Sequence, residues 1–555
     1  MTKITSTASQ ICFGLPVRFV TASLCLAGLP LMVAAQSVGT TPPSIQTPDQ
    51  VATRLGELHY RDGIPDPATA AKIYDYLDFS RGVDSYLNGL PGVSLYAIRK
   101  GFRDVGVKDG DVLLFSRLMD SNSLFLTANI DTVYFWTFLD LSKGPIVIEA
   151  PHEVLGVIDD MWFRWVTDVG VPGPDRGQGG KYLVVPPGYT GPLPEGGYFV
   201  AQARTNSVTL LGRAFLENND PKPATNRIKA ELRIYPYAVG GYGSSIGSFL
   251  TGKSPLGQLA KPLTPRFVEG SGRVMNTIPP NDLSYYTMLN ALVQEEPASA
   301  LDPEIAGEFY AIGIRKGTPF NPDARMTRVL TDAVATGNAA GRVLSAVPRP
   351  EEGFRYYDDP KSHWTNQLFV GGYEFETPPP VITKEGVKPF PSDGARKIDS
   401  RAAMFYVATG ITPAMVMRLP NIGSQYIGTF TDADDQPFDG SKTYKITLPP
   451  NIPAGKFWSI TLYDNQTRSM LQTHQRYPRA GSQSYPTPAA KANADGSITI
   501  YTGPIQPNGV GAGNWIQTVP GKGWWTILRL YNPLPPFFEK TWKPGEFQVV
   551  GNSSE

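Results

Sequence analysis

The sequence contains only two cysteines, Cys12 and Cys25, and both lie within the first 35 residues. From residue 36 onward there is no thiol, which excludes disulfide bonds, thiol catalysis and thiolate metal ligands from that part of the chain. Histidine is also scarce. The chain has four histidines, and no two of them lie close together in the sequence. A zinc site would need ligands from distant parts of the chain. We therefore expect no metal and no organic cofactor.

The chain also has no excess of charge of either sign. Fifty Lys and Arg residues balance fifty Asp and Glu residues. A polyanionic partner selects for a basic surface, so the balance argues against nucleic acid and acidic membrane surfaces as partners. No segment after the N-terminal region is apolar enough to span a membrane. A small molecule is therefore the expected partner. The sequence leaves the oligomeric state open, and a homo-oligomer is possible.

One apolar run is present, at the N-terminus. Lys3 and Arg18 precede "FVTASLCLAGLPLMVAAQ", and Val33-Ala34-Ala35 supplies small residues before Gln36. This pattern predicts a signal peptide cleaved after Ala35. A membrane anchor is the alternative, but roughly 15 apolar residues interrupted by a proline are short for a span. We expect a periplasmic or secreted protein.

Gly (56) and Pro (52) are abundant, and Tyr (26), Phe (26) and Trp (9) supply many aromatic side chains. This mixture favours short strands joined by tight turns. Strand patterns fill residues 112–237 and the C-terminal part, whereas apolar residues recur at helical spacing between about 256 and 346. The prediction is a mainly β fold of two antiparallel β-sandwich, jelly-roll-like domains with a helical segment between them. The expected parts are a signal peptide (1–35), a linker (36–60), an N-terminal β domain (61–250), a helical segment (251–349), an irregular connector (350–400) and a C-terminal β domain (401–555).

The stretch "TANIDTVYFWTFLDL" places an amide and a carboxylate directly before a run of aromatics. If it is one strand, Asn129 and Asp131 share a face, and Tyr134 lies on the other face. An aspartate beside an amide and a phenol can orient a polar ligand or act as a general base. The alternative is that these side chains bond to nearby backbone amides. We take Asp131 as the candidate base and Tyr134 as a binding or charge-stabilising group.

A second candidate set lies in "KFWSITLYDN" and "WWTILRLYNP". Arg529 falls in register with an apolar strand face, and a lone buried charge is costly, so we expect an acidic partner, with Asp464 first. The pair is either a structural ion pair or a clamp that binds an anionic or polyol ligand through the planar guanidinium. Further ligand-binding candidates in this region are Asn514, Trp515 and Tyr531.

Three other motifs are weaker. "GPDRGQGGKY" lacks the Gly-Lys-Ser/Thr ending of a phosphate loop and leads into a strand, although Asp175 and Lys181 could still face a cleft. "GSSIG" matches the nucleophile elbow around Ser245, but the alternating strand-helix pattern of that fold is missing. "TDADDQPFDG" lacks the EF-hand pattern and reads as a solvated turn rather than a calcium loop.

Several separated stretches together resemble one family. "NIDTVYF", "VPGPDRGQGGKYLVVPPGY", "YFVAQARTNSVTLLGRAF" and "LRIYPY" are similar to exported bacterial DUF1254 proteins. "GKFWSITLYDNQTRSMLQT" through "NWIQTVPGKGWWTILRLYNP" resembles the companion DUF1214 domain. Asn129, Asp131 and Tyr134 match the family's Asn-x-Asp-Thr-x-Tyr pattern. The resemblance implies an exported protein of two β domains with a helical segment between them, and it implies no particular reaction.

The function expected from the sequence is a hydrolase or lyase that needs no cofactor. It would act on a small polar or carbohydrate-like substrate in a cleft between the two β domains. The alternative is a non-catalytic periplasmic protein that binds a ligand or maintains the envelope. Asp131 separates the two, because a base needs a raised pKa and space beside it, whereas a structural aspartate is fully hydrogen-bonded.

Overall fold

The computed structural model describes residues 41–238, 246–252, 262–349, 354–366, 380–383, 386–389, 397–410, 412, 415 and 419–551. It divides into two units, Met1–Lys72 and Ile73–Glu555. In the first unit, a small antiparallel sheet follows a 3-10 turn, so strands lie within and just after the segment expected as a linker. These elements are η1 (Pro43–Ile45), β1 (Gln50–Thr53), β2 (Gly56–Arg61) and β3 (Ile64–Pro65).

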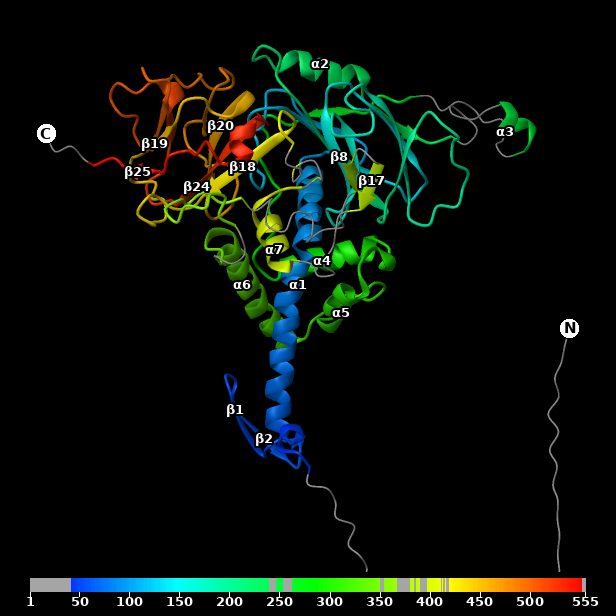
Figure 1. Cartoon of the computed structure of the whole chain (residues 1–555). Coiled ribbons are helices and arrows are strands. Elements are labelled where there is room, and N and C mark those ends of the chain that lie inside the picture. The colour runs from blue at the N-terminus through cyan, green and yellow to red at the C-terminus, as the bar shows by residue number, and fades with distance from the viewer. Residues whose placement is uncertain are drawn as a thin grey trace, which may run out of the picture. The chain divides into compact units, whose positions relative to one another are not determined.

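After a long helix, the second unit continues with two β-sheets that share one apolar core (Figure 1). The larger sheet has the order β14-β4-β6-β12-β8-β9, and the smaller has the order β11-β10-β7-β13. Most neighbouring strands are antiparallel, and the exceptions are the edge pairs β14–β4 and β10–β11. The bounds are β4 (Val112–Phe115), β6 (Val133–Asp140), β7 (Ile146–Ala150), β8 (Leu155–Asp160), β9 (Trp165–Gly170), β10 (Gly180–Val185), β11 (Phe199–Gln202), β12 (Ser207–Ala214), β13 (Arg233–Pro236) and β14 (Phe267–Glu269).

Alternation along the strands explains the core between these sheets. Phe135 of β6 and Leu210 of β12 point into the same apolar cluster as Ile148 and Val184 of the smaller sheet. Their neighbours along the strands point to the opposite face, as a two-residue period requires. Strand β6 begins at Val133, so Asn129 and Asp131 lie in the segment before it rather than inside a strand.

The C-terminal part of the second unit is also a pair of packed sheets, with orders β18-β24-β20-β21 and β23-β22-β19-β25. Their shared core includes Trp458 and Leu528 from one sheet and Ile446 and Ile500 from the other. The prediction of a mainly β fold with two sandwich-like domains is confirmed. The bounds are β18 (Ser424–Thr429), β19 (Tyr444–Leu448), β20 (Ala454–Asp464), β21 (Arg479–Gly481), β22 (Ile498–Gly503), β23 (Trp515–Gln517), β24 (Trp524–Pro533) and β25 (Gln548–Val549).

Helices form between residues 281 and 347, where the apolar spacing indicates them, but the stretch "RAAMFYVATG", expected as a strand of the C-terminal domain, is part of a helix. Helix α1 (Pro67–Asp104) begins in the first unit and continues into the second. Within the second unit, Tyr285 and Tyr286 donate hydrogen bonds to backbone carbonyls of α1, and a Cβ at Gly82 would lie 2.6 Å from Ala333 Cβ. The absence of a side chain at Gly82 therefore lets α1 approach α6 closely. The other helices of this bundle are α4 (Ser284–Glu295), α5 (Pro303–Ala311), α6 (Ala324–Ala346) and α7 (Ile398–Val407).

The remaining described elements are short. None of the helices in the described part of the chain combines the length and hydropathy that a membrane span requires. These elements are β5 (Ser123–Leu124), α2 (Lys222–Glu231), α3 (Ile246–Leu250), β15 (Met275–Asn276), η2 (Ala298–Ala300), β16 (Pro380–Thr383), β17 (Gly386–Pro389), η5 (Ala512–Asn514) and α9 (Pro535–Phe538).

Candidate functional site

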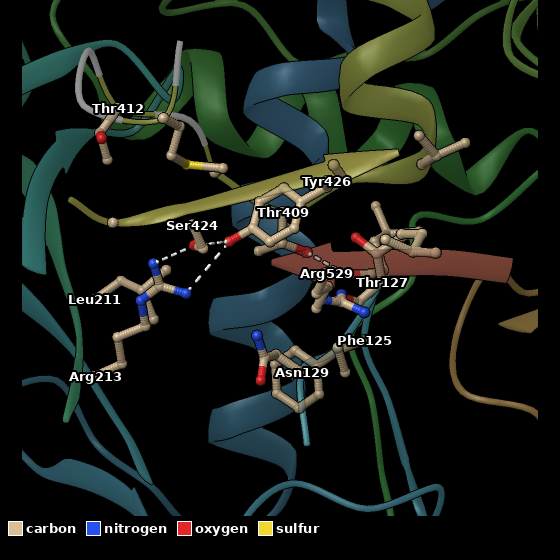
Figure 2. Close-up of a pocket in the computed structure, with 18 of the residues that line it drawn as sticks. Phe125, Thr127, Asn129, Leu211, Arg213, Thr409, Thr412, Ser424, Tyr426 and Arg529 are labelled. Carbon is tan, nitrogen blue, oxygen red and sulfur yellow. Dashed lines mark hydrogen bonds between the residues drawn. The ribbon is translucent and has the colours of Figure 1, made fainter. Parts of the chain in front are cut away.

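A cavity of about 210 Å³ lies between the two β regions of the second unit. Strands β6, β8 and β12 form one wall, β18 and β24 form the opposite wall, and residues at the end of α7 contribute from a third side (Figure 2). Most lining side chains are apolar. They include Trp136, Leu155, Val157, Leu211, Trp525 and Ile527 of the sheets, Met404 and Val407 of α7, and Met415 and Phe430 of the segments before and after β18.

Two arginines interrupt this apolar lining, the buried Arg529 from one wall and the half-buried Arg213 from the other. On the first wall, the register pairs Arg213 with Tyr134, so both point to the same face of the sheet. On the second wall, it pairs Arg529 with Tyr426 in the same way. Cross-strand alignment thus brings two guanidinium groups and two phenols to one cavity.

Arg213 is held by a triangle of hydrogen bonds with two residues of β18. Its Nη2 donates to Ser424 Oγ at 2.8 Å and its Nη1 donates to Tyr426 Oη at 3.3 Å. The two oxygens lie 2.6 Å apart (Figure 2). Burial alone raises the pKa of Tyr426, but the charge of Arg213, the Ser424 hydrogen bond and the charge of Arg529 outweigh it and lower that pKa. The phenol is therefore prepared to lose its proton more readily than an ordinary tyrosine.

Arg529 is anchored by neutral groups only. Its Nη1 donates to Tyr463 Oη at 2.5 Å and its Nη2 donates to the Thr127 carbonyl at 2.9 Å. Its guanidinium carbon lies 5.5 Å from the centre of the Tyr426 ring. Neighbouring tyrosines and Asp131 outweigh desolvation and keep the pKa of Arg529 above its usual value, so its charge persists. Neither cavity arginine forms an ion pair with a carboxylate of the described residues.

Thr127 has a strained backbone at this point. Its φ is 47°, a region that β-branched residues seldom adopt. The conformation is held on one side by the Thr127 N–H, which donates to the Arg468 carbonyl at 2.9 Å, and on the other by Arg529. Local strain of this kind concentrates at functional sites. Here it directs a carbonyl at the arginine that faces the cavity.

Asp131 lies behind the cavity wall, within a closed network. Its Oδ1 accepts a hydrogen bond from Arg479 Nε at 2.5 Å, and both side chains are 0% exposed. Its Oδ2 accepts from Ser459 at 2.6 Å and from Tyr531 at 2.9 Å. Asn129 completes the network, because it accepts from the Asp131 backbone N–H and donates to Tyr531.

These contacts do not suit the proton-accepting role expected for Asp131. Burial raises its pKa, but the charge of Arg479 and the Ser459 hydrogen bond outweigh this effect and lower it. Asp131 does not line the cavity, whereas Asn129, Tyr134 and Arg529 do. Its geometry is that of a structural carboxylate that joins the two β regions.

The expected pairing of Arg529 with Asp464 is wrong. The register places Arg529 opposite Ser459, so Asp464, five residues further along β20, points to the other face of that sheet. Asp464 instead forms an ion pair with Lys522 at 2.7 Å. Its Oδ1 accepts from the backbone N–H of Gln466 and Thr467, as in a turn.

Asn514 and Trp515 are in structural positions away from the cavity. The Asn514 amide bonds to the backbone of Lys491 and to the Thr499 carbonyl, which uses both its oxygen and its nitrogen. The Trp515 indole donates to the Gly503 carbonyl at 3.2 Å. Neither residue lines the cavity.

Where the structure describes them, the residues of the weaker motifs form structural hydrogen bonds and ion pairs. Asp175 accepts a hydrogen bond from the Tyr182 hydroxyl at 2.7 Å, and Lys181 pairs with Glu149 at 3.0 Å. In "TDADDQPFDG", Asp432 accepts from backbone N–H groups of its own turn. Ser245 lies outside the described residues. Across the described ranges, no three His, Cys, Asp or Glu side chains gather as metal ligands would.

Sequence reasoning missed Arg213, Ser424, Tyr426 and Arg479. Ser424 and Tyr426 alternate in "SQYIGT", and Arg213 follows Leu211 at the same two-residue spacing. The argument that a charge in register with an apolar face marks a site could have found Arg213, as it found Arg529. Arg479 gives no such signal, because β21 has only three residues.

Two family models match the chain, each described as a protein of unknown function: DUF1254 over residues 111–236 and DUF1214 over residues 423–535. The chain contains a DUF1254 domain and a DUF1214 domain. The DUF1254 match spans β4 to β13 and the DUF1214 match spans β18 to β24, so the cavity lies between the two domains. The family resemblance is confirmed, whereas export stays a prediction.

No curated protein matches the chain. Among solved structures, it is similar to the VPA0106 protein from Vibrio parahaemolyticus, with 18% identity and a TM-score of 0.47 over 85% of this chain and 100% of that one. It is also similar to a putative uncharacterized protein from Burkholderia cenocepacia, with 13% identity and a TM-score of 0.33 over 87% of this chain and 90% of that one.

Proposed function

We propose that the protein binds a small organic anion, a carboxylate on an apolar body, in the cavity between the DUF1254 and DUF1214 domains. The observation that carries the proposal is the pair of arginines, buried Arg529 and half-buried Arg213, which face one cavity. The described carboxylates form no ion pair with either of them. Burying an unpaired charge is costly, so a site that keeps one such charge buried and a second half-buried is suited to an anion that neutralises them.

The chemistry of the walls determines the rest of the ligand. A guanidinium binds a carboxylate through two parallel N–H donors, which gives both strength and orientation. The remaining lining is dominated by side chains such as Trp136, Leu211 and Ile527, which favour an aromatic or aliphatic body. This replaces the expected carbohydrate-like ligand, since a sugar would need hydroxyl partners around its whole rim.

Benzoate and hexanoate are expected to bind the wild-type protein, whereas the neutral benzamide and hexanamide bind at least about tenfold more weakly. Arg529→Gln should weaken benzoate binding by about 10- to 100-fold, because a hydrogen bond to a charged group is worth about 1.5–3 kcal/mol. Arg529→Lys should give an intermediate loss, since it keeps the charge and loses the planar fork. Isothermal titration calorimetry measures each affinity.

Two further variants make the test decisive. Arg325→Gln removes an arginine that pairs with Asp75 and Asp78 on the helical surface, so it should bind benzoate as the wild type does. Leu211→Trp fills the cavity, so it should abolish binding while the protein remains folded. Equal binding of acids and amides, or binding unchanged by Leu211→Trp, would refute the proposal.

The sequence also predicts export and catalysis, and both predictions belong to this proposal. Export, with cleavage after Ala35, rests on the N-terminal pattern, and Edman sequencing of the mature protein from a periplasmic extract tests it: a first residue of Gln36 is the expected result. Catalysis as a hydrolase or lyase needs a reactive group that faces the ligand. Asp131 does not line the cavity, so that group has to come from another part of the lining.

A further inference from the structure

Ser424 and Tyr426 have the arrangement of a nucleophile and its base. Both line the cavity, and their oxygens are 2.6 Å apart, within the range at which a base activates a hydroxyl. Arg213 donates to both oxygens. Because an arginine can only donate, the Ser424 hydrogen remains free to point at the phenolic oxygen of Tyr426.

The electrostatics favour the same direction of proton transfer. Arg213 of β12 and Arg529 of β24 face Tyr426, and together with the Ser424 hydrogen bond they lower its pKa against the effect of burial. The other ionisable groups around it are the phenols of Tyr134 and Tyr531. The pKa of each is raised, chiefly by burial, so both keep their protons. Tyr426 is therefore the residue of this cluster that, as a phenolate, accepts a proton from serine.

We infer that Ser424 is the nucleophile and Tyr426 its general base in the hydrolysis of an ester that carries a free carboxylate. This inference rests on the proposed function, since it uses Arg529 to hold the carboxylate. Arg529 lies over the Tyr426 ring, with its guanidinium carbon 5.5 Å from the ring centre. A carboxylate bound there places an acyl group a few bonds away beside Ser424.

The reaction balances with water as the second substrate. The Tyr426 phenolate takes the proton of Ser424 as Ser424 Oγ forms a bond to the acyl carbon, and the oxyanion that results lies beside the Arg213 guanidinium. The ester C–O bond then breaks, and the leaving alcohol takes the proton from Tyr426. Water, deprotonated by Tyr426, attacks the acyl-serine, and Ser424 leaves with that proton. The products are one alcohol and one carboxylic acid.

The test uses 4-nitrophenyl methylphosphonate, an ester with one negative charge. Attack by Ser424 forms a serine–phosphorus bond and releases 4-nitrophenolate, which is followed by absorbance, and peptide mass spectrometry locates the adduct. The wild type should be labelled once, on Ser424. Ser424→Ala should not be labelled, and Tyr426→Phe should react at least about 100-fold more slowly, the range for loss of a general base.

Ser345→Ala is the matched control, because Ser345 is a buried serine on α6 that does not line the cavity. It should be labelled at the wild-type rate. Benzoate binding and the unfolding temperature of every variant are measured alongside. Benzoate binding without any labelling would overturn the serine mechanism and leave the proposed function intact. An adduct on another residue would also overturn the serine mechanism, as would a folded Tyr426→Phe variant that reacts at the wild-type rate. If the wild type does not bind benzoate, both the serine mechanism and the proposed function are overturned.

Discussion

Replacing Asp131 with asparagine is expected to lower the free energy of unfolding by about 3–5 kcal/mol, the cost of leaving one member of a buried ion pair without its partner. The partner is Arg479, and both side chains are 0% exposed. Asparagine keeps the shape of the side chain, so the loss reports the charge and the one acceptor oxygen that its NH2 group replaces. Tyr531 and Ser459 would also each donate to a neutral oxygen, which is the weaker kind of hydrogen bond.

Urea unfolding followed by tryptophan fluorescence measures this difference. Asp104→Asn is the matched control, because it breaks the exposed pair of Asp104 with Lys100 and should cost less than about 1 kcal/mol. The double variant Asp131→Leu with Arg479→Met should lose less than Asp131→Asn, since it leaves no charge unpaired. A loss for Asp131→Asn as small as that of the control would show that the network does not join the two domains.

The same carboxylate fixes the sign of a pH effect. The pKa of Asp131 is lower in the folded protein than its ordinary value, because Arg479 and Ser459 outweigh desolvation. Its stabilising contribution is therefore complete above about pH 4, the ordinary range, and is lost as the pH falls through the lowered pKa. The difference between wild type and Asp131→Asn should be constant from pH 6 to 8 and shrink below pH 4.

Most of the fold follows from the sequence, because periodicity depends only on neighbours along the chain. The helical spacing of residues 281–347 predicts α4, α5 and α6, and the alternation in "KFWSITLYDN" predicts the buried strand β20. The site does not follow in the same way. Which residue faces Arg529 depends on the register between β18, β20 and β24, and the turns that set this register leave no period in the sequence.

Asp131 shows which features of the site the sequence indicates and which depend on the fold. Its position in an Asn-x-Asp pattern before an aromatic strand marks it correctly as special. Its role depends on Arg479, which lies 348 residues later in the sequence. Because Asp131 pairs with Arg479, it is a structural carboxylate and not the base that the sequence suggests, and the two residues meet only in the folded chain. The surroundings of Ser424 and Tyr426, the residues proposed for catalysis, are likewise assembled from both domains.

Replacing Asp168 with asparagine is expected to have the opposite effect and to stabilise the protein. Asp168 lies in β9, is 7% exposed and forms no ion pair with the described residues. Burial raises its pKa to about 8, and the indole of Trp165 offsets this only in part. The unfolded carboxyl loses its proton near pH 4, so between about pH 4 and 8 the folded state binds more protons and stability falls as the pH rises.

The slope of that fall is about 1.4 kcal/mol per pH unit, which accumulates to roughly 3–4 kcal/mol at pH 7. Asparagine has no proton to retain, so Asp168→Asn removes this dependence.

Urea unfolding at pH 5, 6, 7 and 8 should show a difference between variant and wild type that grows with pH. Asp332→Asn, an exposed change on α6, should shift stability by less than about 0.5 kcal/mol at every pH. Parallel pH curves for wild type and Asp168→Asn would mean that Asp168 is already ionised in the folded protein, with a cation that neutralises it or water that solvates it. In β8, the strand that pairs with β9, Val157 faces Asp168 and lines the cavity, so the protonation state of this carboxyl also sets the charge next to the cavity wall.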